Sequence, residues 1–257
     1  CSSDLQIIKR HHPSIVILEN VRNLAGPRHI HEWEVIIATL REEGYIVSSK
    51  PAVFSPHLIP KHLGGRPQVR ERVFITCTYA PDKAVSKEFQ HEKPLLYPKP
   101  TGSWLPQNWN LVKDLPLEEN PSDETTKLTD LEIFWIDAWN EWVKMYKRIT
   151  GENPPGFPIW ADAWVPLDSL SIEDETPKWK EDFLVKNATL YTAHKDAFDS
   201  WAGKYGVFTS KFPPSRRKLE WQAQDSEDLW STLMHFRPSG IRAKKMNYVP
   251  ALVAITQ

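Results

Sequence analysis

The sequence has no long apolar run, few cysteines and almost no net charge. Its 257 residues include no stretch of 18 apolar residues, so no membrane-spanning helix is expected. The two cysteines, Cys1 and Cys77, are too few for a disulfide framework and fit a reducing cytoplasm. The net charge of −1 gives no overall basic signal for nucleic acid. With 40% hydrophobic and 25% charged residues, the composition is that of a globular protein with a sizeable core.

Charge and tryptophan are unevenly distributed along the chain. Residues 1–81 hold ten Lys and Arg against seven Asp and Glu, residues 82–203 hold 13 against 22, and residues 204–257 hold nine against four. Eleven of the twelve tryptophans lie between residues 104 and 230. These shifts predict a change of domain near residue 80 and a return near residue 237.

The first 80 residues have the pattern of an α/β domain. Four apolar residues from Ile15 to Leu18 predict a strand buried on both faces. The stretch "IHEWEVIIATLREEG" has helical apolar spacing, with Gly44 as its expected C-cap. "YIVSS" and Val73 to Tyr79 predict two further strands. Strand, helix and strand indicate a parallel sheet, whereas the last two strands, with no helix between them, indicate an antiparallel pair.

The middle of the chain has a different character. Residues 81–127 show little periodicity, and Thr129 and Glu132 then have the spacing of a capping box. Apolar residues recur at helical spacing up to Gly151: Leu131, Trp135, Trp139, Trp142, Tyr146 and Ile149. A row of tryptophans could stack bases, but the helical spacing favours a helix face buried in a core. A turn or short strand is predicted over 156–168, and one or two helices after residue 178.

Two polar blocks stand out in the first domain. Glu19 and Asn20 come at the end of the first predicted strand, where open α/β sheets bind ligands. Taken alone, this pair is more typical of a helix or turn cap. Gln68, Arg70 and Arg72 alternate in "QVRER" and share one face if the chain is extended. Three polar groups on one face are an unusual way to begin an apolar core strand.

These blocks, "ENV" and "QVRER", resemble two signature blocks of the bacterial DNA cytosine-5 methyltransferases of restriction-modification systems. "LREEGYIV" between them fits the family's pattern, and residues 237–257 resemble the stretch before its next signature block. The resemblance frames the whole chain. It implies an α/β fold in which residues 1–80 form the second half of a Rossmann-like S-adenosylmethionine-dependent domain. Residues 81–236 would be a smaller α+β target recognition domain, and residues 237–257 a return segment.

The resemblance also implies roles for these residues. In this family a cysteine thiolate attacks carbon 6 of cytosine, which makes carbon 5 nucleophilic toward the methyl group of S-adenosylmethionine. Glu19 would share a proton with N3 of the base and Arg70 would donate to its O2, which neutralises charge on the ring. Asn20, Gln68 and Arg72 would support these contacts. Such contacts require a base flipped out of double-stranded DNA.

The C-terminal part carries a run of basic residues. The ordinary interpretation of such a run is a solvated face, but the resemblance favours contacts with DNA phosphates. The expected contacts are made by Arg216, Arg217, Lys218, Arg237, Arg242, Lys244 and Lys245.

Two features of the family are not found in the sequence. No GxG occurs among its ten glycines, although the family's cofactor site begins with a Gly-rich turn, and neither cysteine follows a proline as the family's nucleophile does. We therefore expect a central-to-C-terminal fragment of a cytoplasmic bacterial enzyme, inactive alone and lacking most of its S-adenosylmethionine site.

Alternatives to that hypothesis are a catalytically dead DNA-binding or stimulatory module, and one half of a split methyltransferase that needs a separate N-terminal chain. Two histidine pairs, His11-His12 and His29-x-His31, have no Cys or carboxylate partners at ligand spacing, so no metal site is expected.

Overall fold

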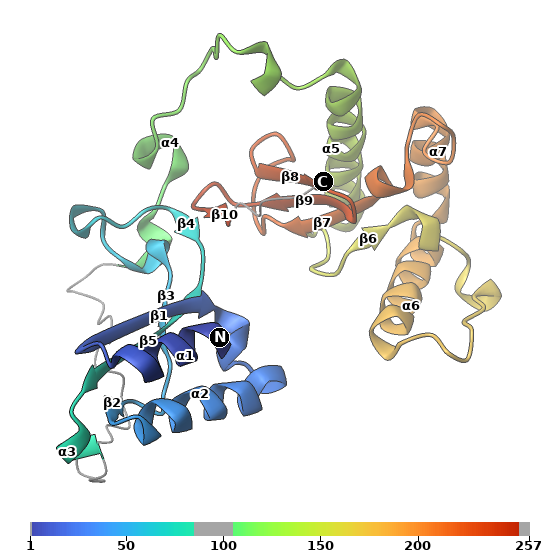
Figure 1. Cartoon of the computed structure of the whole chain (residues 1–257). Helices are drawn as coiled ribbons and strands as arrows, with labels where there is room; N and C mark the ends of the chain where they lie inside the picture. The colour runs from blue at the N-terminus through green and yellow to red at the C-terminus, as the bar shows by residue number, and fades with distance from the viewer. Residues whose placement is uncertain (1, 85–104, 252–257) are drawn as a thin grey trace. The chain divides into compact units, whose positions relative to one another are not determined.

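The computed structural model describes residues 2–84 and 105–251 (Figure 1). The chain divides into two compact units, residues 1–115 with 247–257 and residues 116–246. These boundaries differ from the expected ones near residues 80 and 237. The first unit is longer because the Trp109 indole N–H donates to the His57 carbonyl at 2.8 Å, which fixes this segment to the loop after the third strand.

The first unit is built on a sheet whose central strand is β5 (Arg72–Tyr79). One edge of β5 pairs antiparallel with β1 (Ile15–Val21). The other edge pairs antiparallel with β2 (Tyr45–Val47) and then with β3 (Ala52–Phe54), which the sequence analysis did not identify. The expected parallel pair is therefore wrong. β1 and β2 do run in the same direction, but β5 lies between them.

Two helices, α1 (Ser2–His11) and α2 (Ile30–Glu42), cover one face of this sheet (Figure 1). The predicted face of α2 is buried as expected, through Trp33, Ile36, Ile37 and Leu40. These side chains form one core with Val16, Val73 and Ile75 of the sheet. The helix ends before Gly44, whose φ of +87° is the left-handed conformation that glycine adopts without strain.

β1 is not buried on both faces, contrary to the prediction. Val16 lies in the core, whereas Ile15 and Ile17 are 67% and 62% exposed. Side chains alternate across a strand, and α1 and α2 cover only one face of β1 in the described part of the chain. Glu19 and Asn20 also lie inside β1 rather than just after it, because the strand continues to Val21.

The loop after β3 leads into β4 (Gln68–Val69), which pairs in parallel with β10 (Val249–Pro250). Short helices α3 (Pro81–Ala84) and α4 (Leu111–Asp114) complete the α and β elements of this unit. Single 3₁₀ turns occur throughout the described chain: η1 Arg22–Ala25, η2 Pro27–His29, η3 Pro56–Leu58, η4 Lys61–Leu63, η6 Pro106–Asn108, η7 Glu124–Thr126, η8 Ala161–Ala163, η9 Leu167–Ser169 and η10 Pro214–Arg216.

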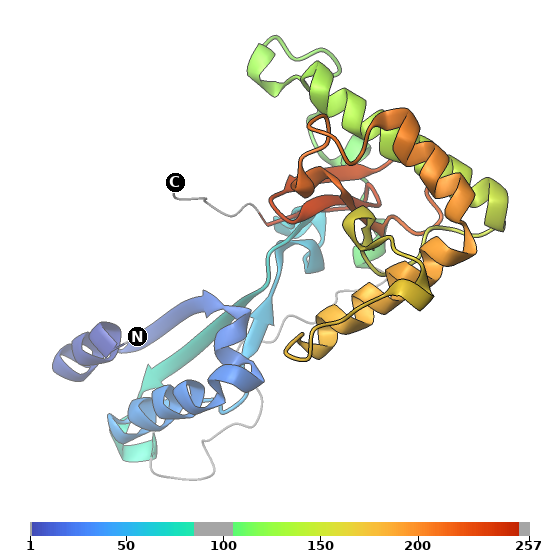
Figure 2. The ribbon, with the colours of Figure 1, turned by 90° about the vertical axis from the view of Figure 1, so that its right-hand side faces the viewer.

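The second unit packs three helices with a small sheet. The helices are α5 (Asp130–Thr150), α6 (Lys178–Ala193) and α7 (Lys195–Tyr205), and Figure 2 shows α5 and α7 side by side. The strands are β6 (Ile159–Trp160), β7 (Lys218–Gln222), β8 (Leu233–Arg237) and β9 (Gly240–Lys244), in the order β6-β7-β9-β8.

The tryptophan row of α5 belongs to the core of this unit, as its spacing predicted. Trp135, Trp139, Trp142 and Tyr146 are buried among residues of α7 and the sheet. The predicted capping box is present, since the Thr129 side chain accepts from the Glu132 backbone N–H and Glu132 reaches back to residue 129. The base-stacking alternative for this row is therefore not supported.

Candidate functional site

A pocket of about 370 Å³ opens on the first unit beside the end of β1. Three of the predicted site residues line it together: Glu19 from β1, Arg72 from β5, and Arg70 from the turn just before β5. The remaining wall is largely apolar and comes from the loop after β3 and from β5: Phe54, Ser55, Pro56, Ile59, Gly64 and Phe74. The chain thus brings charged groups from positions about fifty residues apart into one concave site.

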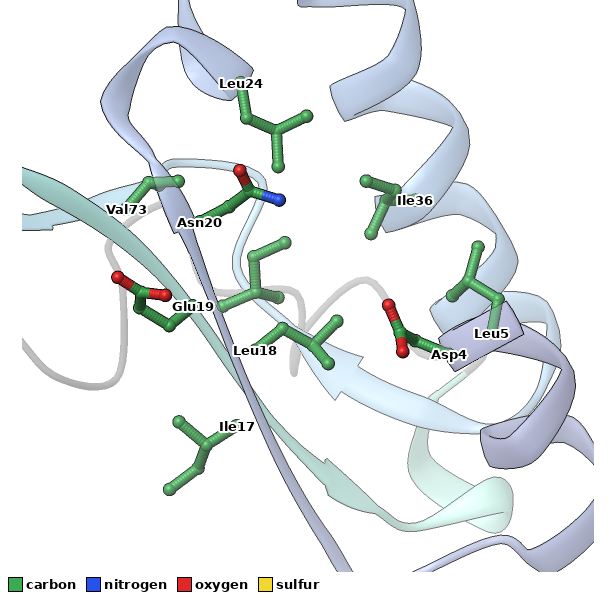
Figure 3. Close-up of a pocket in the computed structure, with 10 residues that line it drawn as sticks. Asp4, Leu5, Ile17, Leu18, Glu19, Asn20, Leu24, Ile36 and Val73 are labelled. Atoms are coloured by element: carbon green, nitrogen blue, oxygen red, sulfur yellow. The ribbon is translucent and has the colours of Figure 1, made fainter. Parts of the chain in front are cut away.

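The alternation of β1 explains why one strand carries both a carboxylate and an amide. Figure 3 shows Leu18 and Asn20 on the side of β1 that faces α1 and α2, whereas Ile17 and Glu19 point to the opposite side. Asn20 accepts the Val21 backbone N–H at 2.8 Å through its own Oδ1. Glu19 is thereby directed to the pocket, and Asn20 holds the local backbone.

The carboxylate of Glu19 is oriented by an ion pair. Arg72 Nε lies 2.8 Å from Glu19 Oε1, and the Glu19 side chain remains 48% exposed on the open side of the pocket. Arg72 also donates from Nη1 to the Glu71 carbonyl at 2.9 Å, which fixes its guanidinium. A carboxylate accepts hydrogen bonds and a guanidinium only donates them. The pocket therefore offers acceptor and donor groups to a polar ligand beside a largely apolar wall.

The third member of the alternating block lies elsewhere. Gln68 belongs to β4 and pairs with Val249, so the expectation that Gln68, Arg70 and Arg72 share one face holds only for the two arginines. Sequence reasoning also missed the aromatic part of the wall. The ring centroids of Phe54 and Phe74 lie 5.1 Å apart. The sequence pattern could have indicated Phe74, because it follows Arg70 and Arg72 at the same spacing of two residues. No such pattern includes Phe54.

The described cysteine is not a reactive group. Cys77 lies in β5, is 1% exposed and has no disulfide partner. Burial raises the pKa of its thiol to about 12, so the thiolate that a nucleophilic cysteine needs is not formed near neutral pH.

The predicted basic residues of the second unit have two different environments. Arg216 and Arg217 are held by the fold: the Arg216 guanidinium lies over the rings of Trp135 and Phe236, and Arg217 Nη1 bonds Asp162 at 3.0 Å. Burial lowers the pKa of Arg216. These contacts give both residues a structural role.

Several other basic residues share the outward face of the small sheet. In β9, Ile241 and Ala243 are buried, so Arg242 and Lys244 point the other way. The strand register places Lys218, His235 and Arg237 of the neighbouring strands on that same face. We call this the basic sheet face, defined as Lys218, His235, Arg237, Arg242 and Lys244.

One carboxylate lies within the basic sheet face. Glu220 of β7 pairs with Arg237 and, at 2.8 Å, with Arg242. Burial alone would raise the pKa of Glu220, but the two arginines bring it below its ordinary value. Lys245 forms an ion pair with Asp225. The sequence analysis identified the arginines and lysines of this face but missed His235 and Glu220, which only the strand register reveals.

Comparisons with known proteins identify the family. The family model of the C-5 cytosine-specific DNA methylases matches residues 3–247. The chain belongs to the C-5 cytosine-specific DNA methylase family. A similar protein is the type II methyltransferase M.AluI of Cellulosimicrobium cellulans, which is 39% identical over 320 aligned residues. This alignment covers 98% of the chain and 61% of the relative, so the chain spans about three fifths of the length of that relative.

The methylase family match bears on the expected fold. It confirms a mixed α/β domain of this family, and it runs from residue 3 through both units. It does not establish that residues 1–80 are only the second half of a catalytic domain. In the described residues no group of three or more His, Cys, Asp or Glu could hold a metal ion. Among those same residues, no helix has the length and apolar character needed to cross a membrane.

The methylases of this family use S-adenosylmethionine, and one further pocket can be tested for it. This pocket, about 220 Å³, lies between β1 and the two helices and is lined mainly by aliphatic side chains such as Leu5, Leu18 and Leu24 (Figure 3). It is smaller than the usual range of about 300–1,000 Å³ for ligand pockets. Its small volume and mainly aliphatic lining assign no cofactor contact to it.

Proposed function

We propose that this chain supplies the cytosine pocket and the target recognition domain of a DNA cytosine-5 methyltransferase of the type II restriction-modification class. One observation carries the proposal: Glu19, Arg70 and Arg72 line one pocket although they come from separate parts of the sequence. A cytosine that enters it meets a carboxylate and two guanidinium groups. The double-stranded DNA must release this base from the helix, because its Watson–Crick edge is otherwise paired.

Each residue has a defined task in this proposal. Glu19 accepts a hydrogen bond from the exocyclic amine of cytosine and shares a proton with N3. Arg70 donates a hydrogen bond to O2. Arg72 keeps the Glu19 carboxylate in place through the 2.8 Å ion pair. Both contacts to the base stabilise the charge that develops on the ring when a nucleophile adds to carbon 6. Phe54 and Phe74 supply an apolar surface beside these charged groups.

The proposal assigns the second unit, residues 116–246, to DNA recognition. Its basic sheet face holds two lysines, two arginines and one histidine, with Glu220 as the carboxylate paired with the arginines, which favours contact with phosphates. Arg216, Arg217 and Lys245 take part in internal contacts, so they contribute less to DNA than the sequence suggested. Base-edge contacts of this unit would set the target sequence.

Methyl transfer tests the proposal directly. Protein expressed from its full reading frame is incubated with mixed-sequence duplex DNA and methyl-labelled S-adenosylmethionine. We expect 5-methylcytosine as the product, and we expect Glu19→Gln to slow its formation by about 100-fold or more, since a positioned acid–base group contributes that much. Glu32→Gln, an exposed carboxylate of α2, is the matched control and should leave the rate unchanged. Product formed at the wild-type rate by Glu19→Gln would refute the proposed role.

A second candidate is a DNA-binding module or a split half without catalysis of its own. The buried Cys77, with its raised pKa, favours this candidate, because it cannot serve as the nucleophile. The same assay separates the candidates. Methylation by the protein alone supports the enzyme, methylation only after addition of a second chain supports a split enzyme, and DNA binding without methylation supports the module.

A further inference from the structure

Ser55, in the wall of the pocket, lies at the centre of a small hydrogen-bond network. Its side chain is almost fully buried, and its hydroxyl oxygen accepts the Arg70 backbone N–H at 2.8 Å. His57 Nδ1 lies 2.8 Å from the same oxygen, and the Gln68 carbonyl lies 3.4 Å away. The network therefore joins the backbone of a pocket arginine to a histidine that the pocket itself does not include.

The Ser55 hydroxyl can serve all three contacts. A hydroxyl has one proton to donate and two lone pairs. Ser55 accepts the Arg70 N–H and donates to the Gln68 carbonyl at 3.4 Å, and the direction of its 2.8 Å contact with His57 Nδ1 depends on the tautomer of the ring. Burial lowers the pKa of His57, which agrees with a neutral ring.

His57 also contacts both segments that connect the first unit to residues 116–246. The Trp109 indole N–H donates to the His57 carbonyl at 2.8 Å, on the segment that leads out of the unit. The Tyr248 ring lies 5.3 Å from the His57 ring, on the segment that returns. Both contacts lie inside the first unit, yet they fix the two places where the chain leaves it and re-enters it.

We propose that His57 and Ser55 are positioning residues that hold Arg70 in the pocket and tie its placement to the two connecting segments. Arg70 itself is exposed, and the arginine lies between β4 and β5. Without the Ser55 bond its backbone N–H would have no fixed orientation relative to the loop. The effect on catalysis rests on the proposed function. The hydrogen-bond network around Ser55 does not.

Amide hydrogen exchange tests whether the hydrogen-bond network holds Arg70. We expect the Arg70 amide to exchange about ten-fold faster in Ser55→Ala and in His57→Ala, because both remove a member of the network. In His57→Asn the side-chain amide can both donate and accept, so it can bond the Ser55 hydroxyl in place of Nδ1, and exchange should return toward the wild-type rate. His62→Ala, an exposed histidine on the same loop, is the matched control. Amides of α5 should be unchanged in all variants.

Kinetics test the consequence for the pocket. We expect Ser55→Ala and His57→Ala to lower kcat by about ten-fold, because misplaced contacts to a reacting group are costly. Affinity for duplex DNA should stay within about two-fold, since phosphate contacts dominate it. His57→Asn should retain most of kcat.

The two measurements separate the hypotheses. If the Arg70 amide exchanges at the wild-type rate in Ser55→Ala and His57→Ala, the network does not hold Arg70. Faster exchange with an unchanged kcat overturns its catalytic role. If the wild-type protein methylates no DNA, the proposed function fails. The exchange data still show whether the hydrogen-bond network holds Arg70. Should Ser55→Ala fail to fold, the comparison of His57→Ala with His57→Asn decides instead.

Discussion

At the scale of single residues, the surroundings of an arginine decide whether it holds the fold or faces outward. Arg216 is enclosed by Trp135 and Phe236, with its guanidinium 5.2 and 4.8 Å from the two ring centroids, and its Nη1 donates to the Arg237 carbonyl at 3.1 Å. Arg242, on the outward face of the small sheet of the second unit, pairs with the carboxylate of Glu220 instead. The two residues should therefore fail in different ways when they are replaced.

Arg216→Ala tests this difference. We expect the variant to lose about 2 kcal/mol of unfolding free energy, because cation–π contacts, stem packing and a hydrogen bond disappear together. Urea unfolding followed by tryptophan fluorescence measures the loss. Arg148→Ala, an exposed arginine of α5, is the control and should change stability by less than about 0.5 kcal/mol. Equal midpoints for the two variants would contradict the structural role.

Residue spacing predicted the charged half of the pocket but not its support. Glu19, Arg70 and Arg72 could be found because short blocks with an odd polar pattern interrupt apolar strands. Ser55 and His57 carry no such signal. Their contacts reach Arg70 and Trp109, which lie 15 and 52 residues further along the chain, and only the folded loop brings those groups together.

At the scale of elements, the loop between β3 and β4 depends on one glycine. Gly65 donates its N–H to the Pro60 carbonyl, and a Cβ on this residue would lie 1.8 Å from the Ile59 carbonyl oxygen. The obstacle is backbone rather than a flexible side chain. Pocket residues Ile59 and Gly64 lie in the same turn.

Gly65→Ala should therefore open this loop. We expect a loss of more than about 2 kcal/mol, because the backbone must move to admit the methyl group. Hydrogen exchange of the β5 amides reports the stability of the first unit. Gly156→Ala, where a Cβ meets nothing within 4 Å, is the control and should leave the protein unaffected. A Gly65→Ala variant as stable as the wild type would show that the loop is loosely held.

The basic sheet face makes the second unit sensitive to mild acid. His235 lies at the exposed surface of this face, where partial desolvation and then the charges of Arg237, Arg242 and Lys244 lower its pKa below the ordinary 6.5. The unfolded chain then takes up a proton at a higher pH than the folded one. This contribution to stability is complete above about pH 6.5 and falls as the pH drops below it.

His235→Gln should weaken that pH dependence. We expect the wild-type urea midpoint to fall between about pH 7 and about pH 5.5, and the variant midpoint to fall less, because the residue no longer titrates. Carboxylates with lowered pKa, such as Glu220, act only at more acidic pH. Tryptophan fluorescence is a suitable probe because nine tryptophans lie within residues 116–246. Identical pH profiles would exclude His235 as the cause.

Periodicity predicted which elements form but not which become neighbours. α2, α5, β1 and β5 lie close to their expected positions because their apolar spacing is regular. The order β1-β5-β2 was not predictable from that spacing, since strand pairing depends on the whole chain. The exposed face of β1 has the same cause: an apolar run does not reveal how many of its faces are covered.

At the scale of the whole molecule, a net charge near zero hides a separation of charge. The basic sheet face lies in a chain whose middle is strongly acidic, so the overall charge of −1 says little about DNA. Local geometry is more informative. Burial lowers the pKa of Lys244, and the charges of Arg242 and Arg237 lower it further. A nearby anion would therefore stabilise the charged form of Lys244.

DNA titration at several salt concentrations tests this face. We expect Lys218→Ala and Lys244→Ala to weaken binding to every duplex by a similar factor and to reduce the salt slope by about one each, as loss of a phosphate contact does. Lys178→Ala is the control, because this exposed lysine of α6 pairs with Glu181 and Asp182. Glu220→Gln should act in the opposite direction. It removes the carboxylate while an amide oxygen can still accept from the arginines, so affinity and salt slope should both rise. If neither lysine variant changes the slope and Glu220→Gln binds no more tightly, DNA does not bind at the basic sheet face.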